Sequence, residues 1–329
     1  MKNVCIVGCG AISGVHAKAI KKSENARLYA VCDVDAEKMK RYNVQQRYTD
    51  FGAVLEDNKI DSVHICTPHY LHYDMIKQAI AHKKSVVCEK PAVMKPDELD
   101  ELSASDGAEN ICCVLQNRLN PCAEMMYGII KSGESGTVKC AKGIMTWYRG
   151  ADYYASGAWR GHYATEGGGV LINQALHTLD LLCLFTGGAQ SVQASSARWL
   201  KASAETEETV TAQLNLRCGG RGIFFATTCY GENPLPEIEV CCENMTLEYR
   251  GGRLYRNGVL IAEDRRVTGE KAYWGTMHDK LISDFYDRGR YIGIKDCADT
   301  LMNMFAMYES MHSGGAETPV RRTIREVKL

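Results

Sequence analysis

The chain has 329 residues, more than one hydrophobic core usually serves, so two domains are expected. Its 39 basic and 40 acidic residues nearly cancel, and no basic block indicates a nucleic acid or an anionic membrane surface as partner. No apolar run approaches the roughly 18 residues of a membrane span, and the run after Lys2 is too short for a secretory signal. These features predict a cytoplasmic protein.

Cysteine usage points the same way. The fifteen cysteines are odd in number and include no C-x-x-C pair. The neighbouring pairs Cys112-Cys113 and Cys241-Cys242 have poor geometry for a shared metal. The histidines around His64 and His72 lack carboxylates at ligand spacing. We therefore expect reduced thiols and no metal site.

The N-terminal segment carries a dinucleotide signature. A strand over 2–7 leads into Gly8–Ser13, a G-x-G-x-x-S turn that opens a helix over about 12–22. The first glycine permits the tight turn, and the second lets backbone amides approach a pyrophosphate. The predicted cofactor-binding residues here are Gly8, Gly10, Ala11 and Ile12.

An acid follows the next predicted strand, over 27–32. Asp33 lies 20 residues after Ser13, where an acid binds the ribose hydroxyls. Asp33 and Asp35 have no arginine immediately after them, which favours NAD over NADP.

The alternation of strands and helices continues to residue 120. Strands are predicted over 61–66, 85–88 and 111–115, with helices over 70–81 and 97–104. This spacing predicts a doubly wound parallel sheet of the Rossmann type, an α/β domain over residues 1–120.

The strand over 85–88 ends in Glu89-Lys90-Pro91. In an open parallel sheet, ligands bind just beyond the carboxyl ends of the strands. Proline disfavours helical angles at Lys90, so the strand should stop there and present the lysine. The alternative is a solvated lysine at an ordinary strand end.

Residues 121–329 have a different pattern of apolar and polar residues. Alternating segments predict strands over 138–148, 192–199, 208–216, 221–228, 238–249 and 253–261, with hairpin turns at Gly219-Gly220 and Gly251-Gly252. Helices are predicted over 123–131, 278–288 and 296–312. We expect an α+β domain with an open, mostly antiparallel mixed sheet and helices on one face.

A glycine run, 167–169, leads into an apolar helix on which Asn173, His177 and Asp180 share one face. A polar seam on such a helix is costly unless it lines a site; the alternative is a buried histidine satisfied by Asp180. The preceding aromatic and basic residues suit a polyhydroxylated ring or, alternatively, a subunit interface; they include Tyr154, Trp159, Arg160 and His162.

In combination, these motifs resemble the glucose–fructose oxidoreductase/inositol dehydrogenase/MocA (Gfo/Idh/MocA) family. The resemblance rests on the glycine turn with His16, on Thr67-Pro68, on Glu89-Lys90-Pro91, and on the glycine-rich segment with Asn173 and His177. It covers essentially the whole chain, and it implies a Rossmann domain followed by a mixed-sheet domain that often mediates dimers or tetramers. Members oxidise or reduce a carbinol of a sugar, cyclitol or related ring with NAD(P).

The resemblance also implies roles for single residues. Lys90 matches the lysine that hydrogen-bonds the reacting hydroxyl, and His177 matches the general acid/base. Asn173 stands where inositol dehydrogenases carry aspartate, which leaves the proton work to Lys90 and His177. Further cofactor-binding candidates are Thr67, Pro68, His72, Glu89, Lys90 and Gln116; substrate candidates are Asn173, Arg118, Asn120, Trp159, Arg160, His162 and Tyr154.

The resulting hypothesis is an NAD-dependent oxidoreductase that acts on a carbohydrate or cyclitol as a homo-oligomer. One alternative is a redox-neutral glycoside hydrolase or lyase that uses the same site through oxidation and elimination. A second is a non-catalytic NAD-binding regulator. The presence of both Lys90 and His177 favours an enzyme.

Overall fold

The chain divides into two compact units. The computed structural model describes residues 1–199, 204–264 and 277–322. Unit 1 comprises Met1–Gln116 and Met277–Cys297, and unit 2 comprises Asn117–Thr276 and Ala298–Leu329. The boundary expected at residue 120 lies near the start of unit 2, but the return of 277–297 to unit 1 was not expected.

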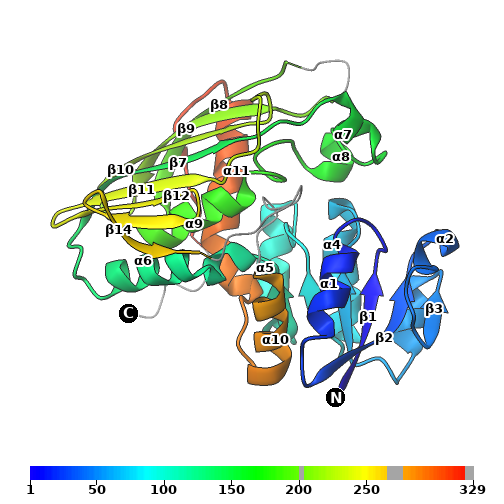
Figure 1. Ribbon diagram of the computed structural model, residues 1–329. Helices are drawn as coiled ribbons and strands as arrows, with labels where there is room; N and C mark the ends of the chain where they lie inside the picture. The colour runs from blue at the N-terminus through cyan, green and yellow to red at the C-terminus, as the bar shows by residue number, and fades with distance from the viewer. Residues whose placement is uncertain (200–203, 265–276, 323–329) are drawn as a thin grey trace. The chain divides into compact units, whose positions relative to one another are not determined.

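Unit 1 is built on a parallel sheet of six strands in the order β3-β2-β1-β4-β5-β6 (Figure 1). All neighbouring pairs run parallel, which confirms the predicted doubly wound fold. The chain order reverses between β1 and β4, and such a switch point is where open α/β sheets bind ligands. The strands are β1 Lys2–Val7, β2 Ala26–Cys32, β3 Gln46–Tyr48, β4 Ser62–Ile65, β5 Ser85–Cys88 and β6 Ile111–Cys113.

The helices of unit 1 include one from the distant C-terminal part of the sequence. Helix α10 packs against α1, where Lys22 Nζ lies 2.7 Å from Asp279 Oδ2 and Ser23 Oγ donates to Asp287 over 2.7 Å. These contacts explain why residues 277–297 belong to unit 1. The helices are α1 Ser13–Ile20, α2 Ala36–Met39, α3 Phe51–Glu56, α4 His72–Ala81, α5 Pro96–Ala104 and α10 His278–Arg288, with 3-10 turns η1 His69–Leu71, η2 Ala108–Asn110 and η5 Ile294–Cys297.

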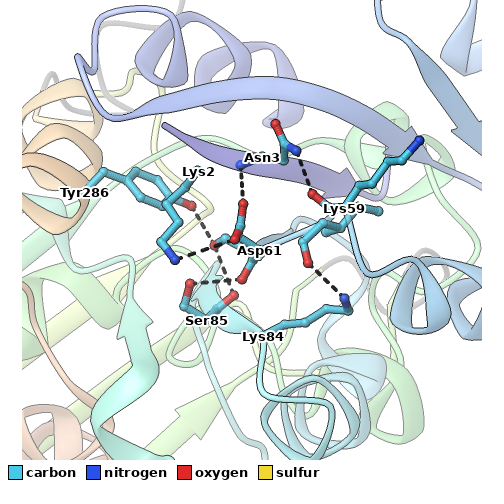
Figure 2. A network of polar contacts seen from close by, with 9 residues as sticks. Lys2, Asn3, Lys59, Asp61, Lys84, Ser85 and Tyr286 are labelled. Carbon is cyan, nitrogen blue, oxygen red and sulfur yellow. Dashed lines mark hydrogen bonds and ion pairs between the residues drawn. The ribbon is translucent and has the colours of Figure 1, made fainter.

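Polar contacts fasten the amino-terminal ends of β1, β4 and β5 (Figure 2). The Asp61 carboxylate accepts a hydrogen bond from the Asn3 amide over 2.8 Å and lies 3.6 Å from Lys2 Nζ. Ser62 Oγ donates to the Ser85 carbonyl over 3.0 Å and lies 2.7 Å from the Tyr286 hydroxyl. This network lies at the amino-terminal ends of the strands, whereas ligands are expected at the carboxyl ends.

Unit 2 is built on a nine-stranded sheet in the order β14-β13-β12-β11-β7-β10-β9-β8-β15. β7 and β10 run parallel, and the other neighbouring pairs run antiparallel, as predicted for an open mixed sheet. The strands are β7 Val138–Thr146, β8 Ala189–Ala197, β9 Thr209–Leu216, β10 Arg221–Thr227, β11 Glu237–Cys242, β12 Thr246–Arg250, β13 Arg253–Arg256, β14 Val259–Glu263 and β15 Thr318–Pro319.

Two segments of unit 2 that were each predicted as one strand form hairpins of two strands. The segment over 238–249 contains most of β11 and β12, and the segment over 253–261 contains β13 and most of β14. At the second turn, Asn257 and Gly258 have φ of 51° and 79°. Two successive residues with positive φ form the tight turn that asparagine-glycine favours. The prediction of two long strands was therefore wrong.

Helices α6, α9 and α11 pack on one face of this sheet, while α7 and α8 lie together beyond the ends of its central strands (Figure 1). The predicted position of Asn173 on the His177 helix was wrong, because α9 begins only at Leu176. No helix among the described residues is long and apolar enough to cross a membrane. The helices are α6 Pro121–Lys131, α7 Ala151–Ala155, α8 Tyr163–Glu166, α9 Leu176–Thr186 and α11 Ala298–His312, and η3 covers Gln116–Leu119 at the junction of the units.

Candidate active site

The glycine turn after β1 has the shape that a dinucleotide requires. Gly8 has φ of +90°, and a Cβ there would lie 2.7 Å from the Cys66 carbonyl carbon, so only glycine fits. Apart from Gly10 and its two chain neighbours, no atom of the described residues lies within 4 Å of a Cβ built on Gly10. The backbone leading to Ala11 and Ile12 at the start of α1 is therefore accessible to a pyrophosphate, and the turn fits NAD.

Asp33 is joined to this turn. Its Oδ2 accepts a hydrogen bond from the Cys9 amide over 2.7 Å, and its Oδ1 accepts one from the Asp35 amide over 2.8 Å. Both bonds hold the carboxylate beside the glycine turn, at the end of β2. This is the position predicted for a ribose-binding acid.

Arg41 also reaches the glycine turn, which sequence reasoning missed. Its Nη2 donates to the carbonyls of Cys9 and Gly10, each over 2.5 Å, and to Ser13 Oγ over 2.8 Å. The short helix α2, which was not predicted, turns the chain back so that a residue eight positions after Asp33 meets the turn. Arg41 is therefore a further candidate for contact with the cofactor.

Glu89 is the centre of a buried polar cluster at the end of β5. Its Oε1 lies 2.9 Å from His16 Nε2 and 3.6 Å from His278 Nε2. Burial by itself would raise the pKa of Glu89, but hydrogen bonds from the two histidines hold the pKa well below its ordinary value. Glu89 is therefore a carboxylate, and its role is to fix the segment that carries Lys90.

His72 ties this segment to the loop after β4. Its Nδ1 lies 2.8 Å from the Pro91 carbonyl oxygen, and its Nε2 lies 2.8 Å from that of Thr67. Burial lowers the pKa of His72 despite both contacts. Lys90 is half-buried and precedes a cis peptide bond to Pro91. Both of its chain neighbours are held: Glu89 by His16, and the Pro91 carbonyl by His72. Pro68 directly precedes η1 in the same loop, and Gln116 is buried at the start of η3.

In unit 2, the glycine run is held by Glu207, which sequence reasoning missed. The Glu207 carboxylate accepts hydrogen bonds from the Gly169 amide over 2.9 Å, the Leu171 amide over 3.2 Å and the Tyr308 hydroxyl over 2.8 Å. Burial raises the pKa of Glu207 to about 7. Gly169 must be glycine, because a Cβ there would lie 1.9 Å from the Glu207 carbonyl oxygen.

Helix α9 places His177 and Asp180 one turn apart. His177 is half-buried, whereas Asp180 is fully buried. Asp180 accepts bonds from Arg118 Nε over 2.8 Å and Nη2 over 2.5 Å, and from Thr300 Oγ1 over 2.7 Å. Arg118, predicted to meet substrate, thus pairs with this buried acid. Asn120, another substrate candidate, donates to the Tyr249 hydroxyl over 3.1 Å.

Asn173 meets a residue that was not predicted, Tyr153 of α7. The Tyr153 hydroxyl oxygen accepts hydrogen bonds from Asn173 Nδ2 over 3.1 Å, from Gln174 Nε2 over 2.9 Å and from Arg160 Nη1. Asn173 Nδ2 also donates to Glu166. The structure therefore brings Asn173 and Arg160 together through one phenol.

The remaining substrate candidates differ in their exposure. Trp159 is half-buried, and its ring lies 4.5 Å from the Arg160 guanidinium carbon. Tyr154 is buried, and burial raises its pKa. His162 is exposed at the start of α8, with Nδ1 3.7 Å from Glu205 Oε1. Of these three, Trp159 lies directly against Arg160.

Family profiles match most of the chain. Residues 2–114 match the profile described as "Oxidoreductase family, NAD-binding Rossmann fold", and residues 124–248 match the "GFO/IDH/MocA C-terminal domain". The chain belongs to the Gfo/Idh/MocA family. The Rossmann domain of this family binds NAD, so the predicted family, fold and cofactor are confirmed.

Relatives and solved structures agree with this membership. The uncharacterized oxidoreductase YrbE of Bacillus subtilis is 29% identical over 138 residues, 40% of each chain. The chain thus spans well under two thirds of this relative's length. D-apiose dehydrogenase of Rhizobium rhizogenes is 24% identical over 295 residues, 84% of each chain. The WlbA dehydrogenase of Bordetella pertussis, solved with NADH and UDP-GlcNAcA, is 22% identical over 98% of each chain with a TM-score of 0.86.

Proposed function

We propose that this Gfo/Idh/MocA protein transfers hydride between NAD and a ring hydroxyl of a sugar, cyclitol or sugar derivative. The observation that carries the proposal is the arrangement at the carboxyl ends of β1, β2 and β5. There, the accessible Gly10 turn, the Asp33 carboxylate and the firmly held Lys90 belong to one unit. The names of D-apiose dehydrogenase and of WlbA, which was solved with a nucleotide sugar, support the substrate class.

Lys90 and His177 have different roles in the transfer of the hydroxyl proton. NAD+, when bound, supplies the acceptor for the hydride. The Lys90 ammonium hydrogen-bonds the reacting hydroxyl oxygen and stabilises the negative charge that develops on it. A ring nitrogen of His177 takes the hydroxyl proton in oxidation and returns it in reduction, directly or through Lys90.

Asn173 can assist only as an acceptor. Its amide nitrogen has two hydrogens, and these point to Tyr153 and Glu166. An amide also cannot take a proton at neutral pH, unlike the aspartate of the inositol dehydrogenases. The chemistry of the amide therefore supports the assignment of proton transfer to Lys90 and His177.

The proposal extends to the protein's setting. The cysteines of the described residues form no disulfide, which supports a reducing compartment, and we place the protein in the cytoplasm. The family resemblance supports a homo-oligomer, a dimer or a tetramer.

The test is NADH absorbance with purified protein, NAD+ and a panel of cyclitols, free sugars, glycosides and nucleotide sugars. We expect a rise with one class of substrate. Release of an aglycone without net NADH would instead show redox-neutral cleavage. Tight NAD binding with neither result would indicate a regulator and would contradict the proposal.

A further inference from the structure

The guanidinium of Arg160 is held in place by aromatic rings. Its central carbon lies 4.3 Å from the ring centre of Tyr153 and 4.5 Å from that of Trp159. Arg160 also donates one hydrogen bond to the Tyr153 hydroxyl. Stacking of this kind fixes the plane of a guanidinium and lowers the entropy lost when it binds a ligand.

Arg160 has no carboxylate partner within the part of the chain that the structure describes. Its contacts there are the Tyr153 hydroxyl and the rings of Tyr153 and Trp159. A guanidinium has five N–H donors, and this hydrogen bond uses one of them. Arg160 is also only half-buried, so the other donors are available to a ligand.

A second guanidinium adds positive charge on the same aromatic group. The central carbon of Arg149 lies 5.2 Å from the ring centre of Tyr153 and 5.1 Å from that of Trp147. Its Nη1 donates to Asn233 Oδ1 over 2.7 Å, a neutral partner. Two cations therefore adjoin the ring of Tyr153.

The acidic residue of this group, Glu166, already accepts hydrogen bonds from other residues. Glu166 is buried, with one oxygen accepting from the Gly161 amide over 2.5 Å and the other accepting from Asn173 Nδ2. It offsets one of the two positive charges. The group of Arg149, Tyr153, Arg160 and Glu166 thus has a net positive charge, and Arg160 is its half-buried cation, whereas Arg149 is buried.

This positive group is joined to a substrate position of the proposed function. Asn173 and Arg160 both donate to the Tyr153 hydroxyl, so both contact the same oxygen atom. We propose that the substrate carries an anionic group, a carboxylate or a phosphate, which Arg160 binds through its planar fork. The inference rests on the proposed function, since it assigns the substrate class of that same site.

The experiment compares neutral sugars with their acidic counterparts. NADH formation is measured with glucose against glucuronate, galactose against galacturonate, and glucose against glucose 6-phosphate, for wild type and for Arg160→Gln. We expect the wild type to prefer an acidic member by about 10- to 100-fold in kcat/KM, the usual range for a charge-assisted bond. The uronate and phosphate arms distinguish the two sources of charge.

The variants separate binding from structure. In Arg160→Gln the preference should vanish through a higher KM for the acid, so that kcat/KM falls much further for the acid than for its neutral counterpart. Arg160→Lys should keep part of the preference, because it keeps the charge but loses the fork. Arg253→Gln is the matched control, since Arg253 pairs with Glu263 on the exposed surface of β13 and β14.

Two results would overturn the inference while leaving the proposed function intact. One is equal or faster oxidation of the neutral sugars by wild type, and the other is an equal loss on both kinds of substrate in Arg160→Gln. If no sugar is oxidised, the proposed function fails, and calorimetric titration of the NADH-loaded protein decides the inference. Binding of the acids alone, lost in Arg160→Gln, would support it; equal or absent binding would overturn it.

Discussion

Nε2 of His16, on α1, lies 2.9 Å from Oε1 of Glu89, at the end of β5. On its other side, His16 Nδ1 lies 2.8 Å from Nδ1 of His64 on β4. His16 thus joins the first helix after the glycine turn to the residue that precedes Lys90. The cofactor turn and the proposed proton-transfer lysine are therefore held by one buried cluster.

We expect Glu89→Gln to lower the free energy of unfolding by about 3 kcal/mol at pH 7, because it removes the charge that the buried histidines face. Since the pKa of Glu89 is held below its ordinary 4.5, its contribution is full above that pH and declines as pH falls through the folded-state pKa. The gap between wild type and variant should therefore shrink below pH 4.5. Urea unfolding at several pH values measures this; equal stability at pH 7 would refute the pairing.

The two glycines of the cofactor turn should respond differently to alanine. Gly8→Ala should lower stability and NAD binding together, since its Cβ would collide with the Cys66 carbonyl carbon at 2.7 Å. Gly10→Ala should fold with wild-type stability, because its Cβ meets no described atom beyond its chain neighbours within 4 Å, yet bind NAD more weakly by about tenfold or more. Thermal unfolding and calorimetric titration with NAD+ check both. Wild-type NAD affinity in Gly10→Ala would contradict the assignment of this turn.

Glu207 should make stability depend on pH near neutrality. Its pKa is about 7 in the folded protein against an ordinary 4.5, so the folded state holds a proton that the unfolded state loses between these values. Stability should therefore fall by roughly 3 kcal/mol as pH rises from 4.5 to 7 and then level off. Glu207→Gln should flatten this fall. Urea midpoints from pH 5 to 8 test it, and an unchanged slope in the variant would exclude Glu207 as the source.

The buried pair of Arg118 and Asp180 should matter for folding. Arg118→Met would leave the fully buried Asp180 carboxylate without its cation, at a cost of about 3 to 5 kcal/mol. Thr300→Val removes one hydrogen bond to the same carboxylate and should cost about 1 kcal/mol. Unfolding in urea ranks the two variants. If Arg118→Met matched wild type, the ion pair would not support α9.

Much of unit 1 was predictable from sequence because its strands are short apolar runs with clear ends. The strands over 2–7 and 85–88 were predicted with the bounds that the structure has. In unit 2, the tight turn at Asn257-Gly258 was overlooked, so β13 and β14 were taken as one strand. The alternation of apolar residues continues across such a turn, and only the turn residues reveal it.

The site was less predictable because its contacts join distant parts of the chain. Sequence patterns marked Lys90, Asn173 and His177, since each lies at a motif. They could not show Arg41 at the glycine turn or Glu207 under the glycine run, because neither lies at a motif and each depends on how intervening segments fold. Tyr153 belongs to the aromatic and basic segment that the sequence marked, but nothing in the pattern singled it out as the partner of Asn173.

We propose that Lys90 and His177 carry the proton transfer of an NAD-dependent sugar or cyclitol dehydrogenase. The most direct measurement is kcat for NADH formation by wild type, Lys90→Met and His177→Gln on the best substrate of the panel, with NAD+ affinity measured in parallel. We predict that kcat falls by about 100-fold or more in each variant while NAD+ affinity stays within a few-fold. Wild-type turnover in both variants would contradict the assignment of proton transfer to Lys90 and His177.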